Sequence, residues 1–186
     1  MEQLVTDLSK YNNQWFKPGK NAFVRLIWYF VNTLFFINSL NGSSRLKIIL
    51  LRMFGAKIGK GVVIKPGINI KYPWNLIIGD YTWVGERVWI DNLDNVTIGS
   101  NCCLSQGAVL LSGNHNYKKS TFDLMVLPII IEDGVWIGAD SMVTGGSICK
   151  NHSVLCVKSV ASGNLESYSI YRNNPAIKIK DRIIES

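Results

Sequence analysis

The chain has 186 residues, of which 47% are hydrophobic and 18% are charged. That length and composition exclude an intrinsically disordered chain and suffice for one domain with a substantial core, alone or with an appendage. The net charge of +7 is compatible with nucleic acid, an anionic membrane surface or a phosphorylated small molecule as partner. Because the Lys and Arg residues form no run, no nucleic-acid partner is expected.

Residues 1–55 are predicted to form an N-terminal helical segment. Their polar start, MEQLVTDLSKYNNQWFKPGK, carries no secretory signal, so a cytoplasmic protein is expected. The apolar stretch 21–40 is almost long enough to cross a bilayer, but Arg25, Asn32 and Asn38 interrupt it. We therefore expect a buried or oligomer-facing helix. Peripheral contact with the inner face of a membrane stays open as an alternative, because the aromatic residues of this stretch suit an interface.

A second helix is expected within the letters SSRLKIILLRMFG. Ser43 or Ser44 can cap its start, and Gly55 can end it. The pattern of the sequence changes immediately after this glycine.

From residue 56 to residue 166, an aliphatic or small apolar residue recurs at a period of six. Fifteen positions follow the pattern: Ile58, Ile64, Ile70, Ile78, Val84, Ile90, Ile98, Leu104, Leu110, Ile131, Ile137, Val143, Cys149, Leu155 and Ala161. Three hexads can close one turn of a prism, of about 18 residues, with hydrogen bonds running from turn to turn. The sequence therefore predicts an all-β solenoid, a parallel β-helix of about five coils. Glycines after the repeat residue are expected to let the backbone turn.

One long insertion interrupts the repeat. Two steps span eight residues, but the step from Leu110 to Ile131 spans 21, so residues 111–130 are predicted to leave the coil as an extruded loop. Loops of this length in a compact domain are usually functional or disordered. This one holds His115, one of only two histidines in the chain. Residues 167–186 are expected to form a C-terminal tail.

The four cysteines predict neither disulfides nor a metal site. No CxxC pair occurs and no histidine lies at zinc-finger spacing, so reduced thiols and no bound metal are expected. The repeat places Cys102 and Cys149 inside the coil, where they would pack. Neither Cys103 nor Cys156 has a base beside it in the sequence, so a cysteine acyl-enzyme is not expected.

Three segments of the repeat, IGDYTWVGERVWI, TIGSNCCLSQGAVL and IEDGVWIGADSMV, resemble the hexapeptide-repeat acyltransferases. The segments YNNQWFKPGKN and FGAKIGKGVVIKPGINIKYPW resemble, within that family, the O-acetyltransferases of colanic-acid and other exopolysaccharide biosynthesis. The resemblance covers nearly the whole chain. It implies a left-handed coil, a homotrimer, acetyl-CoA as donor, and a small-molecule or lipid-linked saccharide as acceptor. The spacing alone does not give the handedness.

The resemblance also places catalysis at His115, the histidine of GNH in the predicted loop. A sugar hydroxyl needs a base when it attacks the thioester, and neutral imidazole suits that task near pH 7. The family often has an acidic residue where this chain has Asn116, which argues against a neighbouring charge that orients the imidazole; a backbone carbonyl could still do so. The candidates for acceptor binding are Asp91, Asn92, Asn114, Tyr117 and Glu86.

The donor groove is assigned by the resemblance of VWIGAD to the family motif, at Trp136, Gly138 and Ala139. The remaining candidates for binding coenzyme A are Val157 and Ser162 along the groove and Lys178 and Lys180 at the phosphates. The chain departs from the family at Gly163, where a lysine is usual. Arg172 or Lys158 could meet the phosphates instead.

Together these expectations define an acetyl-CoA-dependent O-acetyltransferase with His115 as general base. A non-catalytic trimeric β-helix with a degenerate donor site is the alternative, because the C-terminal segment departs from the family. A metal enzyme with three histidine ligands is excluded, since the chain has two histidines.

Overall fold

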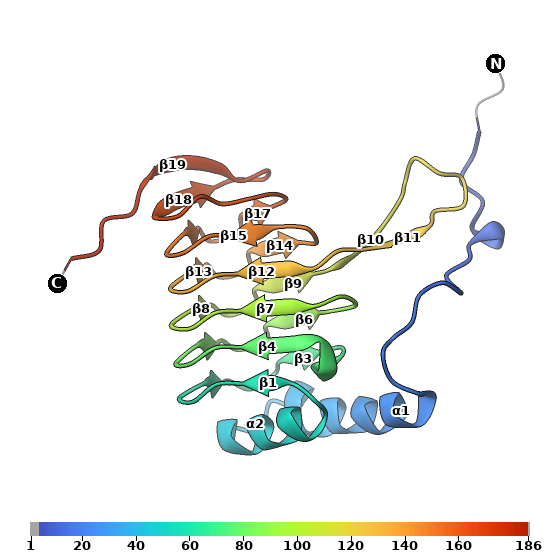
Figure 1. Cartoon of the computed structure of the whole chain (residues 1–186), viewed down its shortest axis with the longest axis horizontal. Coiled ribbons are helices and arrows are strands. Elements are labelled where there is room, and N and C mark those ends of the chain that lie inside the picture. Colours follow the sequence, from blue (N-terminus) through green and yellow to red (C-terminus); the bar gives the residue numbers. More distant parts are fainter. Residues whose placement is uncertain (1–3, 186) are drawn as a thin grey trace.

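A computed structural model describes residues 4–185, which form a three-sided β-helix standing on a helical base (Figure 1). The base consists of a short 3₁₀ turn η1 (Leu8–Lys10), the helix α1 (Ala22–Val31), its π-helical continuation η2 (Asn32–Ile37) and the helix α2 (Ser44–Met53). The side chains of Asn21 and Ser43 cap α1 and α2, because each accepts a backbone N–H of the first turn.

Three parallel sheets form the faces of the prism. Face A contains β1 (Lys57–Ile58), β4 (Leu76–Ile78), β7 (Val96–Ile98), β12 (Ile129–Ile131) and β15 (Ile148–Cys149). Face B contains β2 (Val63–Ile64), β5 (Trp83–Val84), β8 (Cys103–Leu104), β13 (Trp136–Ile137), β16 (Val154–Leu155) and β18 (Ser169–Arg172). Face C contains β3 (Asn69–Ile70), β6 (Trp89–Asp91), β9 (Val109–Leu111), β14 (Met142–Thr144) and β17 (Val160–Ala161). A 3₁₀ turn, η3 (Pro73–Asn75), lies between β3 and β4.

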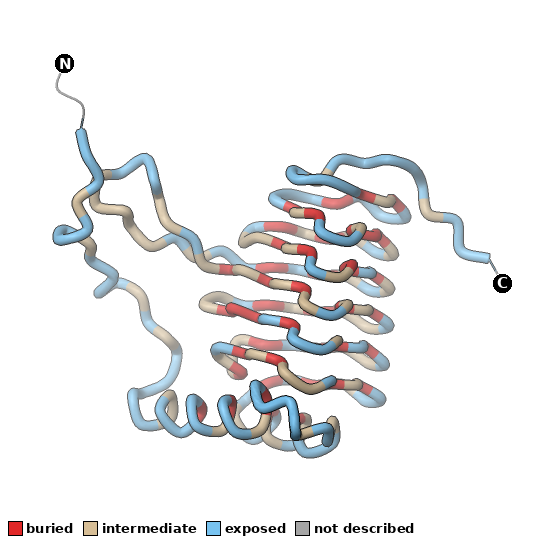
Figure 2. Tube along the Cα trace, turned by 180° about the vertical axis from the view of Figure 1, so that it is seen from behind, coloured by how far each residue is buried: buried red, intermediate tan, exposed pale blue. Residues whose placement is uncertain are grey.

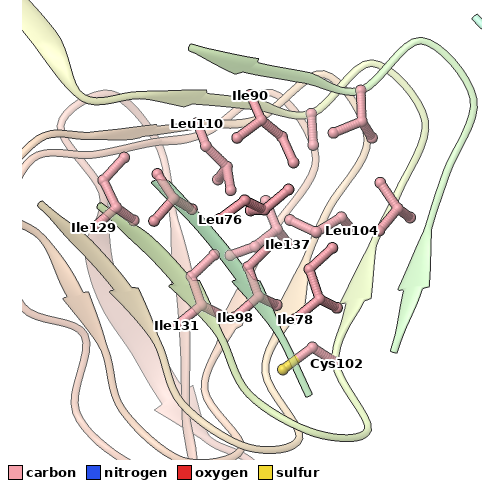
Figure 3. Close-up of a cluster of buried hydrophobic side chains, with 14 of the residues drawn as sticks. Leu76, Ile78, Ile90, Ile98, Cys102, Leu104, Leu110, Ile129, Ile131 and Ile137 are labelled. Atoms are coloured by element: carbon pink, nitrogen blue, oxygen red, sulfur yellow. The ribbon is translucent and has the colours of Figure 1, made fainter. Parts of the chain in front are cut away.

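The strand register confirms the six-residue repeat. On face A, Cα partners follow one another through Ile58, Ile78, Ile98, Ile131 and Cys149. The repeat residues of faces B and C stack in the same way, and all fifteen positions are buried. The aliphatic side chains converge inside the coil (Figure 3), and buried segments recur on every turn (Figure 2). The chain winds in a left-handed sense (Figure 1).

The coil has about six turns, one more than expected. Five turns contribute a strand to every face, and an incomplete sixth adds Leu165 beside Cys149 on face A and β18 beside β16 on face B. The sequence pattern missed this turn because Tyr171, not an aliphatic residue, occupies the interior position next to Leu155. The strand β19 (Ile177–Asp181) then pairs antiparallel with β18 and ends the stack.

The glycines after the repeat residues serve a different purpose from the one expected. A Cβ at Gly79 would lie 2.6 Å from the carbonyl carbon of Gly99, and a Cβ at Gly138 would lie 2.6 Å from the backbone nitrogen of Val157. These glycines are therefore needed for the close approach of successive turns. The left-handed backbone at the corners occurs two residues later, at Tyr81 (φ 55°) and Asp140 (φ 52°).

The helical base covers the first turn of the coil. α2 lies against β1 and β2, and η2 lies against β3. The buried indole of Trp28 donates its Nε1–H to the carbonyl of Ile70 at 2.9 Å, and the amide of Asn32 donates to Asn69 Oδ1 at 2.8 Å. Within residues 4–185, none of the helices has the length and apolar character needed to cross a bilayer.

The insertion is a β-hairpin rather than an irregular loop. β10 (Gly113–His115) pairs antiparallel with β11 (Leu124–Val126). The hairpin leaves the coil after β9, at the corner between faces C and A, and the chain returns through β12. The N-terminal segment extends along the same side of the molecule (Figure 1), where the N–H of Asp7 donates to the carbonyl of Ser120 at 2.8 Å.

Candidate active site

The hairpin, the N-terminal segment and the corner between faces C and A enclose a cavity of about 700 Å³. We call it the hairpin cavity; its lining includes Tyr11, Arg25, Lys71, Asp91, Asn114 and His115. The base, the first three turns of the coil and the insertion all contribute to it. Residues far apart in the sequence therefore meet here.

The imidazole of His115 is held by Phe122 across the hairpin. Its Nδ1 lies 2.9 Å from the carbonyl oxygen of Phe122, and the two rings stack at 4.5 Å with an interplanar angle of 7°. A carbonyl only accepts, so Nδ1 carries the proton and Nε2 keeps a free lone pair in the neutral ring. Phe122 itself adopts a left-handed backbone (φ 51°). Tyr11 packs on the imidazole from the N-terminal segment, with ring centroids 5.7 Å apart.

Hydrogen bonds at the end of the hairpin fix its shape. Asp123 accepts from Lys119 Nζ at 2.8 Å and from Thr121 Oγ1 at 2.6 Å, and these bonds hold the pKa of Asp123 below its ordinary value. The side chain of Asn114 accepts the N–H of His115 at 2.7 Å. His115 is therefore presented by an ordered ribbon.

Asp91 brings a carboxylate to the same cavity. It ends β6, is only 6% exposed, and its Oδ1 lies 2.9 Å from Lys71 Nζ. The guanidinium of Arg25 reaches the cavity from α1. An imidazole, a carboxylate and two cations thus line one space, which suits a polar ligand with several hydroxyl groups.

Of the five residues predicted to bind the acceptor, the structure brings two, Asp91 and Asn114, together with His115. Asn92 does not line the cavity: it is completely buried, and its side-chain amide bonds both the N–H and the carbonyl of Tyr72. Tyr117 is 76% exposed on the hairpin turn, outside the cavity. Glu86 lies at another corner of the coil, in a depression with Trp83.

A second cavity, of about 570 Å³, runs along the corner between faces B and C. We call it the corner groove; its lining includes four predicted donor residues, Trp136, Gly138, Ala139 and Val157, and also Ser105 and Arg172. The indole of Trp136 is fixed by a 2.9 Å hydrogen bond from Nε1–H to Ser105 Oγ. Glycine and alanine leave the wall of the groove open to a thin ligand.

Three predicted donor residues lie outside the corner groove. Ser162 is exposed after β17, at the corner where face C ends. Lys178 pairs with Asp181 at 2.6 Å on β19, and Lys180 is exposed on the same strand. Arg172, one of the two residues named above as alternatives for meeting the phosphates, lines the groove.

Sequence reasoning missed several residues of the hairpin cavity. Tyr11 and Arg25 come from the N-terminal segment and α1, and Lys71 comes from the first turn. Phe122 was not recognised because its backbone carbonyl contacts the imidazole, and any residue type could supply that carbonyl. The resemblance of two segments to the family was the available signal, since YNNQWFKPGKN begins at Tyr11 and FGAKIGKGVVIKPGINIKYPW contains Lys71.

Three of the four thiols are poor nucleophiles. Burial raises the pKa of Cys149 to about 12, and burial also raises the pKa values of Cys102 and Cys103. Thiols that stay protonated are inert at neutral pH. Among residues 4–185, no three His, Cys, Asp or Glu side chains are grouped to hold a metal ion.

Comparisons with known proteins give a relative for the sequence and neighbours for the fold. No protein-family model matches the chain. The "Putative colanic acid biosynthesis acetyltransferase" of Escherichia coli K12 is 36% identical over 179 residues, which cover 96% of this chain and 98% of that protein. A maltose O-acetyltransferase from Clostridium difficile superposes with a TM-score of 0.80 at 19% identity, covering 98% of this chain and 100% of the other. A Vibrio cholerae hexapeptide-repeat acetyltransferase, solved with acetyl-CoA, gives a TM-score of 0.78 at 20% identity, covering 87% and 88%.

Proposed function

Since the chain belongs to the hexapeptide-repeat acetyltransferases, in the group of the colanic acid biosynthesis enzymes, we propose that it transfers acetyl from acetyl-CoA to a saccharide hydroxyl with His115 as general base. The observation that carries the proposal is the bond from His115 Nδ1 to the Phe122 carbonyl, which leaves Nε2 as a base in the hairpin cavity. Four free thiols and acetyl-CoA as donor fit a reaction in the cytoplasm.

The chemistry needs one base and no covalent enzyme intermediate. Nε2 of His115 takes the proton of the acceptor hydroxyl while that oxygen attacks the thioester carbon. Collapse of the tetrahedral intermediate expels the thiolate of coenzyme A, which takes the proton from the imidazolium. The ring returns to its neutral form, and the Phe122 carbonyl restores the same tautomer.

The acceptor of the proposal is a saccharide whose hydroxyl groups Asp91 can bind. The carboxylate of Asp91 accepts hydrogen bonds from hydroxyl groups, and its ion pair with Lys71 orients it. The sequence relative is named for colanic acid, and a fold neighbour is named a maltose O-acetyltransferase, so both names point to sugars. Small-molecule and lipid-linked saccharides share this chemistry.

The corner groove is the donor site of the proposal. Trp136 forms one wall, the small residues Gly138 and Ala139 admit the pantetheine arm, and Arg172 supplies a cation for the phosphates. The fold neighbour from Vibrio cholerae was solved with acetyl-CoA, which supports this donor class.

The arrangement of the two cavities supports a homotrimer. The hairpin cavity lies at the corner between faces C and A and the corner groove at that between faces B and C, and among the described residues none lines both. One chain therefore cannot bring its own His115 to its own groove. A ring of three chains sets each hairpin beside the groove of its neighbour.

The test compares variants at the two histidines of the chain. His115→Ala should lower acetyl transfer, measured as acceptor-dependent thiol release, by at least about 100-fold, while calorimetry still detects acetyl-CoA binding. His152→Ala is the matched control, since His152 lies outside both cavities. Unchanged turnover in His115→Ala would contradict the assignment, and absent acetyl-CoA binding in the wild type would instead favour a non-catalytic module.

A further inference from the structure

The charge of the chain is divided unequally along its length. Eleven of the 20 Lys and Arg residues lie between residues 8 and 79, and none of the 13 Asp and Glu residues does. This segment contains the helical base and the first turn of the coil. The rest of the chain holds more acidic than basic residues. One end of the prism is therefore strongly cationic.

The outer side of α1 is apolar, whereas the solvent side of a surface helix is normally polar. Phe23, Leu26 and Phe30 of α1 and Leu34 of its continuation η2 are 54–70% exposed and recur at the spacing of a single helical stripe. Trp28, which packs on the coil, lies on the opposite side of the helix. Burial against the coil therefore does not account for these four side chains.

The second helix of the base repeats this arrangement. Leu46, Ile49 and Met53 are exposed at spacings of three and four, and Met53 is 74% exposed. Lys47 and Leu51 form the buried side of α2. Trp28 of α1 and the buried side of α2 pack on the first turn of the coil, whereas the residues of both apolar stripes are exposed. Both helices lie at the base of the coil (Figure 1) and contain exposed segments (Figure 2).

We call the two stripes together the basal surface; it consists of Phe23, Leu26, Phe30, Leu34, Leu46, Ile49 and Met53. Exposed cations stand on the same helices and the adjoining chain: Lys20, Arg45, Arg52, Lys57 and Lys60. Aromatic and aliphatic side chains flanked by Lys and Arg, without acidic residues, are the features of helices that lie in the interface of an anionic membrane.

We propose that the basal surface docks the protein on an anionic lipid bilayer. The apolar stripes enter the boundary between headgroups and acyl chains, and the surrounding cations meet the lipid phosphates. A second copy of the chain is a poorer occupant, because two basal surfaces facing each other would oppose cations with cations.

Docking in this way would place the hairpin cavity beside the membrane. Arg25 stands on α1, one residue from the outer stripe, and lines that cavity. A saccharide attached to a lipid would then reach His115 without leaving the bilayer. The docking does not depend on acetyl transfer; only this consequence rests on the proposed function.

The test is co-sedimentation with vesicles of phosphatidylcholine alone and of phosphatidylcholine with phosphatidylglycerol. The wild type should bind the anionic vesicles, and raising the ionic strength should weaken the binding. A Leu26→Gln, Phe30→Gln double variant should bind at least about ten-fold more weakly. The matched control is Ile183→Gln with Ile184→Gln, which removes two exposed apolar side chains near the C-terminus.

A second double variant, Arg45→Glu with Lys57→Glu, tests the charges without touching the apolar stripes and should also lose at least about ten-fold. Circular dichroism checks that each variant is folded, and transfer to a water-soluble acceptor reads out the proposed function separately. Equal binding of the wild type to both vesicle types, or to neither, would overturn the docking. So would a stripe variant that binds like the wild type, or one that changes only the oligomeric state in ultracentrifugation.

Discussion

The corner groove and the hairpin cavity lie on two corners of the same coil, and they are built in different ways. The groove is formed by the repeat itself: Trp136 and Val154, which both line it, are Cα partners on successive turns. The cavity is formed where the chain leaves the repeat, by the hairpin, the N-terminal segment and the end of β6. The comparison teaches that a rigid stack can form one binding site by repetition alone, while segments inserted into the stack form a second site whose residues are specific to this chain.

The largest expected effect concerns the interior of the coil on which the groove is built, and it is a change of the free energy of unfolding with pH. Cys149 is fully buried and its pKa is raised from 9.0 to about 12, so the folded state keeps the thiol neutral while the unfolded state ionises. The free energy of unfolding should therefore fall above pH 9 by about 1.4 kcal/mol per pH unit, and by about 4 kcal/mol near pH 12. Stability from this group is complete below pH 9.

Urea unfolding of the wild type and of Cys149→Ala between neutral and alkaline pH measures this slope. The variant lowers stability at every pH, but its alkaline slope should be smaller by the stated amount. Cys156→Ala, which removes a half-exposed thiol, is the control. Identical slopes in all three proteins would show that burial does not hold the Cys149 proton.

Asp91→Asn addresses the hairpin cavity. Loss of the carboxylate removes charge-assisted hydrogen bonds to the acceptor, so kcat/KM for the acceptor should fall by about 10- to 100-fold. The KM for acetyl-CoA should stay the same, because Asp91 lies outside the corner groove. Asp94→Asn, in the same step of the repeat, is the control and should change either parameter less than about two-fold. An equal effect of both variants would remove Asp91 from acceptor binding.

Trp136→Ala tests the corner groove and should affect acetyl-CoA rather than the acceptor. The KM for acetyl-CoA should rise about ten-fold, because the pantetheine arm loses one wall of the groove, and the acceptor KM should not change. Trp83→Ala is a matched control, since Trp83 is exposed on the same face two turns below Trp136. Steady-state kinetics in both substrates decides; a rise in the acceptor KM alone would reverse the roles given to the two cavities.

Phe122→Ala, in the hairpin cavity, should have the smallest effect on acetyl transfer. The backbone carbonyl that accepts from His115 stays, but the stacked ring is lost, so kcat should fall about two- to ten-fold with little change in either KM. Tyr117→Ala, on the exposed turn of the same hairpin, should be close to wild type. If the two variants behave alike, stacking does not position the imidazole.

The sequence allowed the coil to be predicted because its period is imposed by geometry. Residues such as Ile78 and Ile98 must stack, so every turn repeats the same requirement, and the buried side chains follow. His115 could be singled out because it lies where this regularity is interrupted and within a family motif; its role as the base stays a prediction. The sixth turn was hidden by Tyr171, which fills an aliphatic position with an aromatic ring.

The acceptor and phosphate residues were harder to predict because polar side chains have several uses. Asn92 has the right chemistry for a sugar, but it satisfies the backbone of Tyr72 inside a turn. Lys178 has the right charge for a phosphate, but its partner is Asp181. Only the three-dimensional arrangement shows which competing partner a polar group has found.

The antiparallel strand β19 has a consequence for how the protein behaves in bulk. A parallel stack ends in unpaired N–H and carbonyl groups, which are a template for another chain and, repeated, for a fibre. β19 uses the free edge of β18, and its own outward residues, IKIKD, are all exposed, with charges at Lys178, Lys180 and Asp181. Such a charged border strand repels further addition. The protein thereby sets its own length and resists growth into filaments at that end.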